Sequence, residues 1–191
     1  MKFCSAVIAL VAATMATVSV AESRNIDTPA VQDATIPFSY KRCEECPEND
    51  CRKCALGHEN TLIVSPMDPA HRALVKFHMP VANFQVESCA VQIPAFINNN
   101  STGSIVISHA ALGDWSEATV NAINAPVIGS VINNLEVPAY NNLGPIDITS
   151  ACKEAIDGEF NLYFHAGNKR FEFPSRDSGN PAILHIKTKD E

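Results

Sequence analysis

The chain has 191 residues, a formal net charge of −7 and seven cysteines. An acidic surface repels phosphate backbones, so the composition argues against nucleic acid as a partner. This length suits one domain with a real core and a short appendage.

Residues 1–21 have the features of a secretory signal peptide. Lys2 is followed by an apolar run from Phe3 to Val18, and Ser19 and Ala21 satisfy the small-x-small rule for cleavage. A membrane anchor is the alternative, but the run contains small and hydroxyl residues and is marginal for a span of about 20 apolar residues. We therefore expect cleavage after Ala21, an extracellular (secreted) protein and no membrane insertion. Loss of Lys2 from the 14 basic side chains would leave 13 against 21 acidic ones.

Residues 22–57 are expected to form an extended, cysteine-rich N-terminal segment, and residues 58–191 a β-sandwich domain. Between Glu22 and Lys41 few side chains are large and apolar, and Pro29 and Pro37 interrupt the segment. We expect a flexible or extended lead-in without regular structure there.

An even number of cysteines remains once Cys4 is removed with the signal, which predicts three disulfides in an oxidising compartment. The six are Cys43, Cys46, Cys51, Cys54, Cys89 and Cys152. The first four form two CxxC pairs that could hold zinc, but only four residues separate the pairs, against about 15 to 20 in ribbon sites. A redox CxxC would need a βαβ context, which is missing. We expect a two-disulfide knot with its pairing left open, a third bridge between Cys89 and Cys152, and no metal.

Short apolar runs with turn signals between them follow the cluster and predict an all-β sandwich. They are Thr61–Val64, Arg72–Phe77, Cys89–Ile93, Ser104–Ser108, Leu135–Val137, Ile146–Ile148, Phe160–Phe164, Phe171–Phe173 and Ile183–Lys187. In Phe160–Phe164 the alternation places Phe160, Leu162 and Phe164 on a buried face and Tyr163 on a polar one. One short helix is predicted for Ser150–Ile156, capped by Thr149 or Ser150 and ended by Asp157 and Gly158.

The loop Asn98–Gly103 carries two overlapping glycosylation sequons, at Asn99 and Asn100. The sequence contains no GxSxG motif of a serine hydrolase and no pair of histidines at metal-ligand spacing. We therefore predict no enzyme activity, no catalytic residues and no cofactor.

The order of motifs in the second half of the chain resembles that of a known family. Asp114–Val120 and Asn124–Pro126 are followed by Pro145–Cys152, Glu159–Phe164 and Pro174–Ile186. This arrangement resembles the β-sandwich modules of carbohydrate-binding module family 96, also called DNRLRE-type domains, and the cysteine-rich prefix looks like that of secreted fungal members. The resemblance implies a jelly-roll-like antiparallel β-sandwich with one short helix that plugs one end, behind a disulfide-rich N-terminal segment.

The resemblance also implies a secreted, non-catalytic protein whose partner is a polysaccharide or cell-wall glycan. The alternative is a cell-surface structural or adhesion protein that uses the same sandwich without specific sugar affinity. Candidate ligand contacts are Tyr140 and Tyr163 as stacking rings, or as tyrosines that are partly buried and use the hydroxyl as a handle. The basic candidates are Lys169 and Arg170, at a predicted hairpin tip, and Arg176, which either contacts sugar or pins its loop through an internal ion pair. The lone tryptophan, Trp115, is expected to pack against the sandwich.

Overall fold

The structure is a computed structural model that describes residues 23–67 and 69–189; the expected signal peptide lies outside these residues. The described chain is built mainly from strands, as predicted. The strands are β1 (Asn25–Pro29), β2 (Gln32–Phe38), β3 (Thr61–Val64), β4 (Ala70–His78), β5 (Val86–Gln92), β6 (Gly103–Ala110), β7 (Ile128–Val137), β8 (Ile146–Asp147), β9 (Glu159–Ala166), β10 (Phe171–Pro174) and β11 (Ile183–Thr188).

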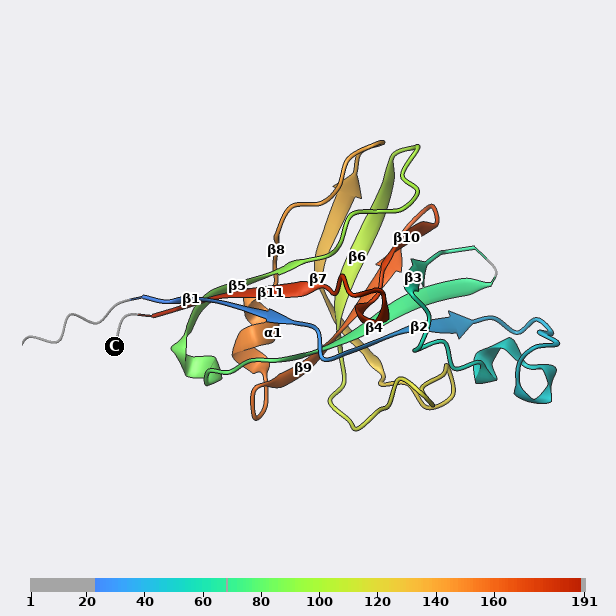
Figure 1. The fold of residues 1–191 in the computed structure, drawn as a ribbon, viewed down its shortest axis with the longest axis horizontal. Coiled ribbons are helices and arrows are strands. Elements are labelled where there is room, and N and C mark those ends of the chain that lie inside the picture. Colours follow the sequence, from blue (N-terminus) through green and yellow to red (C-terminus); the bar gives the residue numbers. More distant parts are fainter. Residues whose placement is uncertain (1–22, 68, 190–191) are drawn as a thin grey trace, which may run out of the picture.

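The strands form an antiparallel sandwich. One sheet has the order β2-β4-β9-β6-β7, a second has the order β1-β11-β5-β8, and β10 pairs with β3. Apolar side chains from all three groups share one core, in which the rings of Phe164 and Phe173 meet edge to face with centroids 6.2 Å apart. Figure 1 shows β1 beside β11, so the first and last strands of the described chain are neighbours.

The one α-helix within the described residues, α1 (Thr149–Glu154), is shorter than predicted. Thr149 is its first residue and not its cap, and the Asp147 carboxylate accepts the N–H of Thr149 at 2.9 Å. The predicted stop at Asp157 and Gly158 is wrong, because both residues belong to the turn that leads into β9, where their φ values are 52° and 77°. Short 3-10 turns occupy Pro47–Asn49, Cys51–Lys53, Asn83–Gln85 and Arg176–Ser178.

The expected lead-in without regular structure is wrong, because residues 22–41 contain β1 and β2. Pro29 lies in β1 and Pro37 in β2, and both strands are at a sheet edge, where the missing N–H of proline is tolerated. Ala34 and Ile36 of β2 are fully buried. The domain limits inferred from the sequence stay a prediction.

The expected polar face of β9 is also wrong, because this strand is buried on both of its faces. A second apolar cluster on its outer face joins Tyr163 of β9 and Leu74 of β4 to Trp115 and Val120 from the loop 111–127. The Trp115 indole donates to Oδ1 of the buried Asn161 at 3.0 Å. The expectation that Trp115 packs against the sandwich is therefore confirmed.

The predicted hairpin between Phe164 and Phe171 is a crossing between two sheets. β9 belongs to the five-stranded sheet and β10 pairs with β3, so residues 167–170 form a corner and not a hairpin tip. This corner lies next to the start of β6, since Gly167 donates its N–H to the Ser104 carbonyl at 2.9 Å. The corner brings Lys169 close to the loop between β5 and β6.

Candidate functional site

The five side chains proposed as ligand contacts are divided among three places in the fold. Tyr163 lies under the loop 111–127, Arg176 lies in a charged network after β10, and Tyr140, Lys169 and Arg170 lie in loops at the end of the sandwich where β7 finishes and β9 crosses to β10. The structure therefore does not gather the five into one site.

Tyr163 is wrong as an exposed stacking ring, because its side chain has no exposed surface. Its hydroxyl donates to the Pro126 carbonyl at 2.9 Å, and burial raises the pKa of this phenol to about 12. The structure thus supports the alternative hypothesis for Tyr163, in which the ring is buried and its hydroxyl makes the polar contact. It fastens the loop 111–127 to the sheet.

Arg176 belongs to a network that we call the Glu117 junction, formed by Asp33, Glu117, Arg176, Asp177 and His58. The Arg176 guanidinium donates from Nε to Glu117 Oε1 at 3.1 Å and from Nη2 to Glu117 Oε2. The same guanidinium lies 3.0 Å from Asp177 Oδ1. Hydrogen bonding to Glu117 and the nearby carboxylates raise the pKa of Arg176, so its charge is fixed. The sequence left two hypotheses for Arg176, a sugar contact or an internal ion pair, and this pairing supports the internal ion pair.

The backbone also takes part in the Glu117 junction. Glu117 Oε1 accepts the N–H of Asp33 at 2.7 Å, and Asp33 Oδ2 accepts the N–H of Arg176 at 2.7 Å. β2, the loop 111–127 and the segment after β10 are thereby joined through two carboxylates. Gly57 packs against the backbone of Glu117 so closely that a Cβ would collide with it, which seats the cysteine-rich segment on the same junction.

Asp33 is the most perturbed acid of the junction. It is 1% exposed, and within the described chain its Oδ1 has no hydrogen-bond partner. Burial is the main cause that raises the pKa of Asp33 to about 6, against the lowering effect of the Arg176 N–H. The carboxyl therefore titrates in mildly acidic solution.

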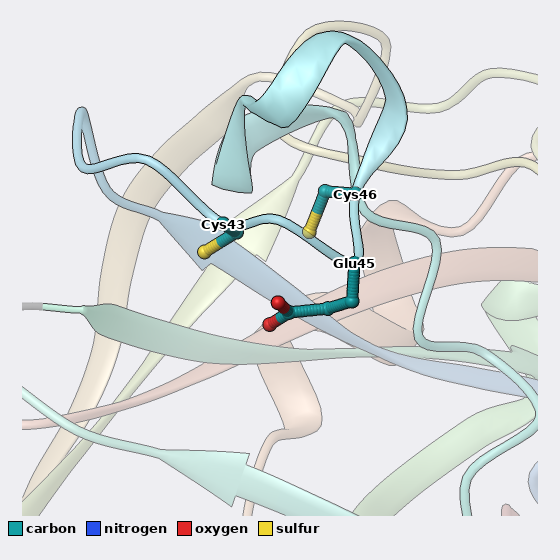
Figure 2. Close-up of side chains that lie close together, drawn as sticks. All are labelled: Cys43, Glu45 and Cys46. Atoms are coloured by element: carbon teal, nitrogen blue, oxygen red, sulfur yellow. The ribbon is translucent and has the colours of Figure 1, made fainter.

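In the part of the chain that the structure describes, two groups of side chains have the types and closeness that could hold a metal ion. In the first, His58, Glu117 and Asp177, both oxygens of Glu117 are already bonded to Arg176, so a cation would have to displace the guanidinium. Figure 2 shows the second, in which Cys43 and Cys46 lie beside Glu45. The expected absence of a metal stays a prediction.

Disulfide bonds remove the thiolates that the second group would need. Cys43 is bonded to Cys51 and Cys46 to Cys54, so the predicted two-disulfide knot is confirmed and its pairing is resolved. Zinc bound by four thiolates is incompatible with these bonds. The predicted bridge between Cys89 and Cys152 is present as well and ties β5 to α1.

At the other end of the sandwich, the side chain of Asn99 joins three segments of the chain. We call this group of residues the Asn99 junction; it is formed by Asn99, Ser101, Pro138, Asn141 and Lys169. The Asn99 amide donates to the carbonyls of Pro138 at 2.9 Å and Asn141 at 2.6 Å, and its Oδ1 accepts from Lys169 Nζ at 2.7 Å. The loops after β5, β7 and β9 are therefore held together by one neutral side chain.

Lys169 is committed to the Asn99 junction and is not a free cation. Its ammonium also donates to the carbonyl and hydroxyl of Ser101 and lies 4.5 Å from the centre of the Phe171 ring. Burial lowers the pKa of Lys169. These contacts use the donors that a sugar hydroxyl would need, so Lys169 positions its neighbours.

Tyr140 and Arg170 remain as side chains that can face a ligand. Tyr140 is 82% exposed, and its N–H donates to the Asn99 carbonyl at 2.6 Å. Its φ of 62° is in the left-handed region, which is uncommon for a bulky residue and often accompanies functional positions. Arg170 is 44% exposed and uses its Nε to bond Glu172 at 2.6 Å.

Sequence reasoning missed Asp33 and the structural use of Asn99. Asp33 lies in the segment expected to lack structure, although the apolar Ala34, Ile36 and Phe38 recur there at every second position, as in a strand. The sequence identifies Asn99 only as a glycosylation acceptor. Its second role depends on loops 39 to 70 residues away and has no local signal.

The fold and its three disulfides together define a disulfide-stapled β-sandwich module of an extracellular protein. The chain belongs to carbohydrate-binding module family 96, whose family model matches residues 50–188. An uncharacterized secreted protein of Arthroderma benhamiae is 44% identical to it over 178 residues, which cover 92% of this chain and 91% of the relative. These findings confirm the resemblance to a secreted fungal member.

The localisation follows from the same findings. The relative is a secreted protein and the three disulfides suit an oxidising compartment, so the protein is extracellular. None of the helices in residues 23–67 and 69–189 has the length and apolar character needed to cross a membrane. Membership of a carbohydrate-binding family implies carbohydrate binding, and it leaves the polysaccharide and the contact residues to be assigned.

Proposed function

We propose that this protein is a secreted, non-catalytic module that binds polysaccharide with the surface around Tyr140. One observation carries the proposal: Tyr140 is an 82% exposed ring whose backbone is fixed by the Asn99 carbonyl. Because the backbone of Tyr140 is held in advance, less conformational freedom is lost when a sugar stacks on the ring. Family membership supplies the class of ligand.

Arg170 supports the proposal as a second exposed side chain in the loops at this end of the sandwich. It follows Lys169, which bonds the same asparagine that holds Tyr140. With its Nε on Glu172, the remaining guanidinium N–H groups can donate to hydroxyls of a bound chain. Lys169 and Arg176 contribute through the geometry of their loops, because their donors are used within the protein.

Binding of the mature protein, residues 22–191, to a polysaccharide array tests the proposal. We expect saturable binding to at least one polysaccharide, and a loss of about tenfold in affinity for Tyr140→Ala, which corresponds to about 1.4 kcal/mol of stacking. Tyr140→Phe keeps the ring and should bind as the wild type does. Tyr40→Ala is the matched control, since Tyr40 is 89% exposed and lies in the cysteine-rich half of the chain.

The second candidate is a structural or adhesion protein of the cell surface. It is favoured by the fact that Tyr163, Lys169 and Arg176 all serve the frame of the module. The two candidates differ in one measurement. Absence of saturable binding to any polysaccharide, by protein with native disulfides, would reject the first and leave the second.

A further inference from the structure

The two overlapping sequons differ in what the fold demands of their asparagines. Both amide hydrogens of Asn99 are needed for its bonds to the carbonyls of Pro138 and Asn141. An N-linked glycan replaces one of these hydrogens, so a glycan on Asn99 would break at least one bond and place a sugar between the loops. The Asn99 junction as built therefore requires an unmodified Asn99.

Asn100 has no such constraint. Its side chain is exposed and makes no hydrogen bond to the described residues. The sequon Asn100-Ser101-Thr102 lies in a loop whose three residues are all exposed. A glycan there can extend into solvent without any change in the fold.

From this difference we propose that Asn100 is the glycosylated residue of the pair, and that its glycan lies over the Tyr140 ring. Position 100 follows directly the residue whose carbonyl bonds the Tyr140 N–H. The first sugars of the glycan are thus within reach of the ring. A tethered sugar acts at a high effective concentration, which a free sugar must exceed to displace it.

This inference rests on the proposed function only in its last step. If Tyr140 binds sugars, the attached glycan occupies the platform, and glycosylation sets how much of the secreted protein is free to bind other chains. The position of the glycan and its cover of Tyr140 are measurable without any external polysaccharide.

The first experiment locates the glycan. The full chain is secreted from a eukaryotic host, and the peptide containing both sequons is mapped by mass spectrometry after enzymatic deglycosylation in heavy-oxygen water. We expect the label on Asn100, loss of the glycan in Asn100→Gln, and its retention in Asn99→Gln. Label on Asn99 alone, or no glycan at all, would overturn the proposal.

The second experiment measures the cover of Tyr140 by its nitration with tetranitromethane. We expect nitration of Tyr140 to be several-fold slower in the glycosylated protein than in Asn100→Gln, while Tyr40, which is also exposed, reacts equally in both. Equal rates at Tyr140 would reject the cover. If the rates differ but neither form binds polysaccharide, the proposed function fails and the cover stands.

Discussion

The Glu117 junction and the Asn99 junction solve the same problem with different chemistry. Each fastens three segments of the chain through one side chain that bonds both backbone and a cation. Glu117 is 7% exposed and charged, whereas Asn99 is only partly buried and neutral. The buried ionic junction should therefore dominate stability, and the neutral one should mainly set the geometry of its neighbours.

The largest effect is expected from removal of the Glu117 carboxylate. Glu117→Ala leaves the Asp33 N–H without its partner and the Arg176 guanidinium with Asp177 alone. Loss of one member of a buried ion pair costs about 3 to 5 kcal/mol, and because the Arg176 side chain is 37% exposed we expect about 3 kcal/mol. The unfolding temperature should fall by about 10 °C for a chain of this size. Asp114→Ala, at an exposed carboxylate of the same loop, is the control. Equal unfolding temperatures for the two variants would contradict the comparison.

The next effect is the pH dependence contributed by Asp33. Its pKa is about 6 in the folded protein and 3.8 in the unfolded chain, so the folded state holds the proton more tightly. The resulting stabilisation is complete below about pH 4 and is lost as the pH rises through about 6, by roughly 2 to 3 kcal/mol. Asp33→Asn should remove this slope between pH 4 and 7 in urea unfolding. A variant that keeps the wild-type slope would show that another group titrates.

A smaller loss of stability is expected at the other junction. Asn99→Ala removes three hydrogen bonds that are partly open to water, and the cost should be about 1 to 2 kcal/mol. The ammonium of Lys169 keeps its hydrogen bonds to Ser101 in this variant. Asn98→Ala, at an exposed neighbour, gives the baseline in the same denaturant titration. If Asn99→Ala cost as much as Glu117→Ala, burial would not be the property that separates the junctions.

The smallest effect, and one of opposite sign, is expected at Tyr140. Tyr140→Gly relieves the left-handed backbone at φ 62° and removes an exposed ring, so stability should rise by about 0.5 to 1 kcal/mol. Calorimetric unfolding of this variant beside Tyr140→Ala separates backbone strain from loss of the ring. Loss of stability in Tyr140→Gly would mean that the ring packs on its surroundings.

The fold could be predicted from the sequence because its signals are local or can be counted: apolar and polar residues alternate along the strands, and an even number of cysteines remains after the signal peptide. Phe160, Leu162 and Phe164 indicated a strand, and the distant pair Cys89 and Cys152 was the one left after the cluster closed on itself. The candidate site could be predicted less well from the sequence. Whether Lys169 or Arg176 is free depends on partners such as Asn99 and Glu117 in other loops, and the residue that covers Tyr163 is set by a loop with no regular structure.

β2 and the residues up to Gly57 decide where an independently folding unit can begin. β2 supplies Asp33 to the Glu117 junction and Ile36 to the cluster on the outer face of the five-stranded sheet. A protein shortened to start at residue 58 would expose the edge of β4 and the apolar side of Leu74 to water. Transplanting this module into another protein therefore has to carry the chain from β1 onward, disulfide knot included.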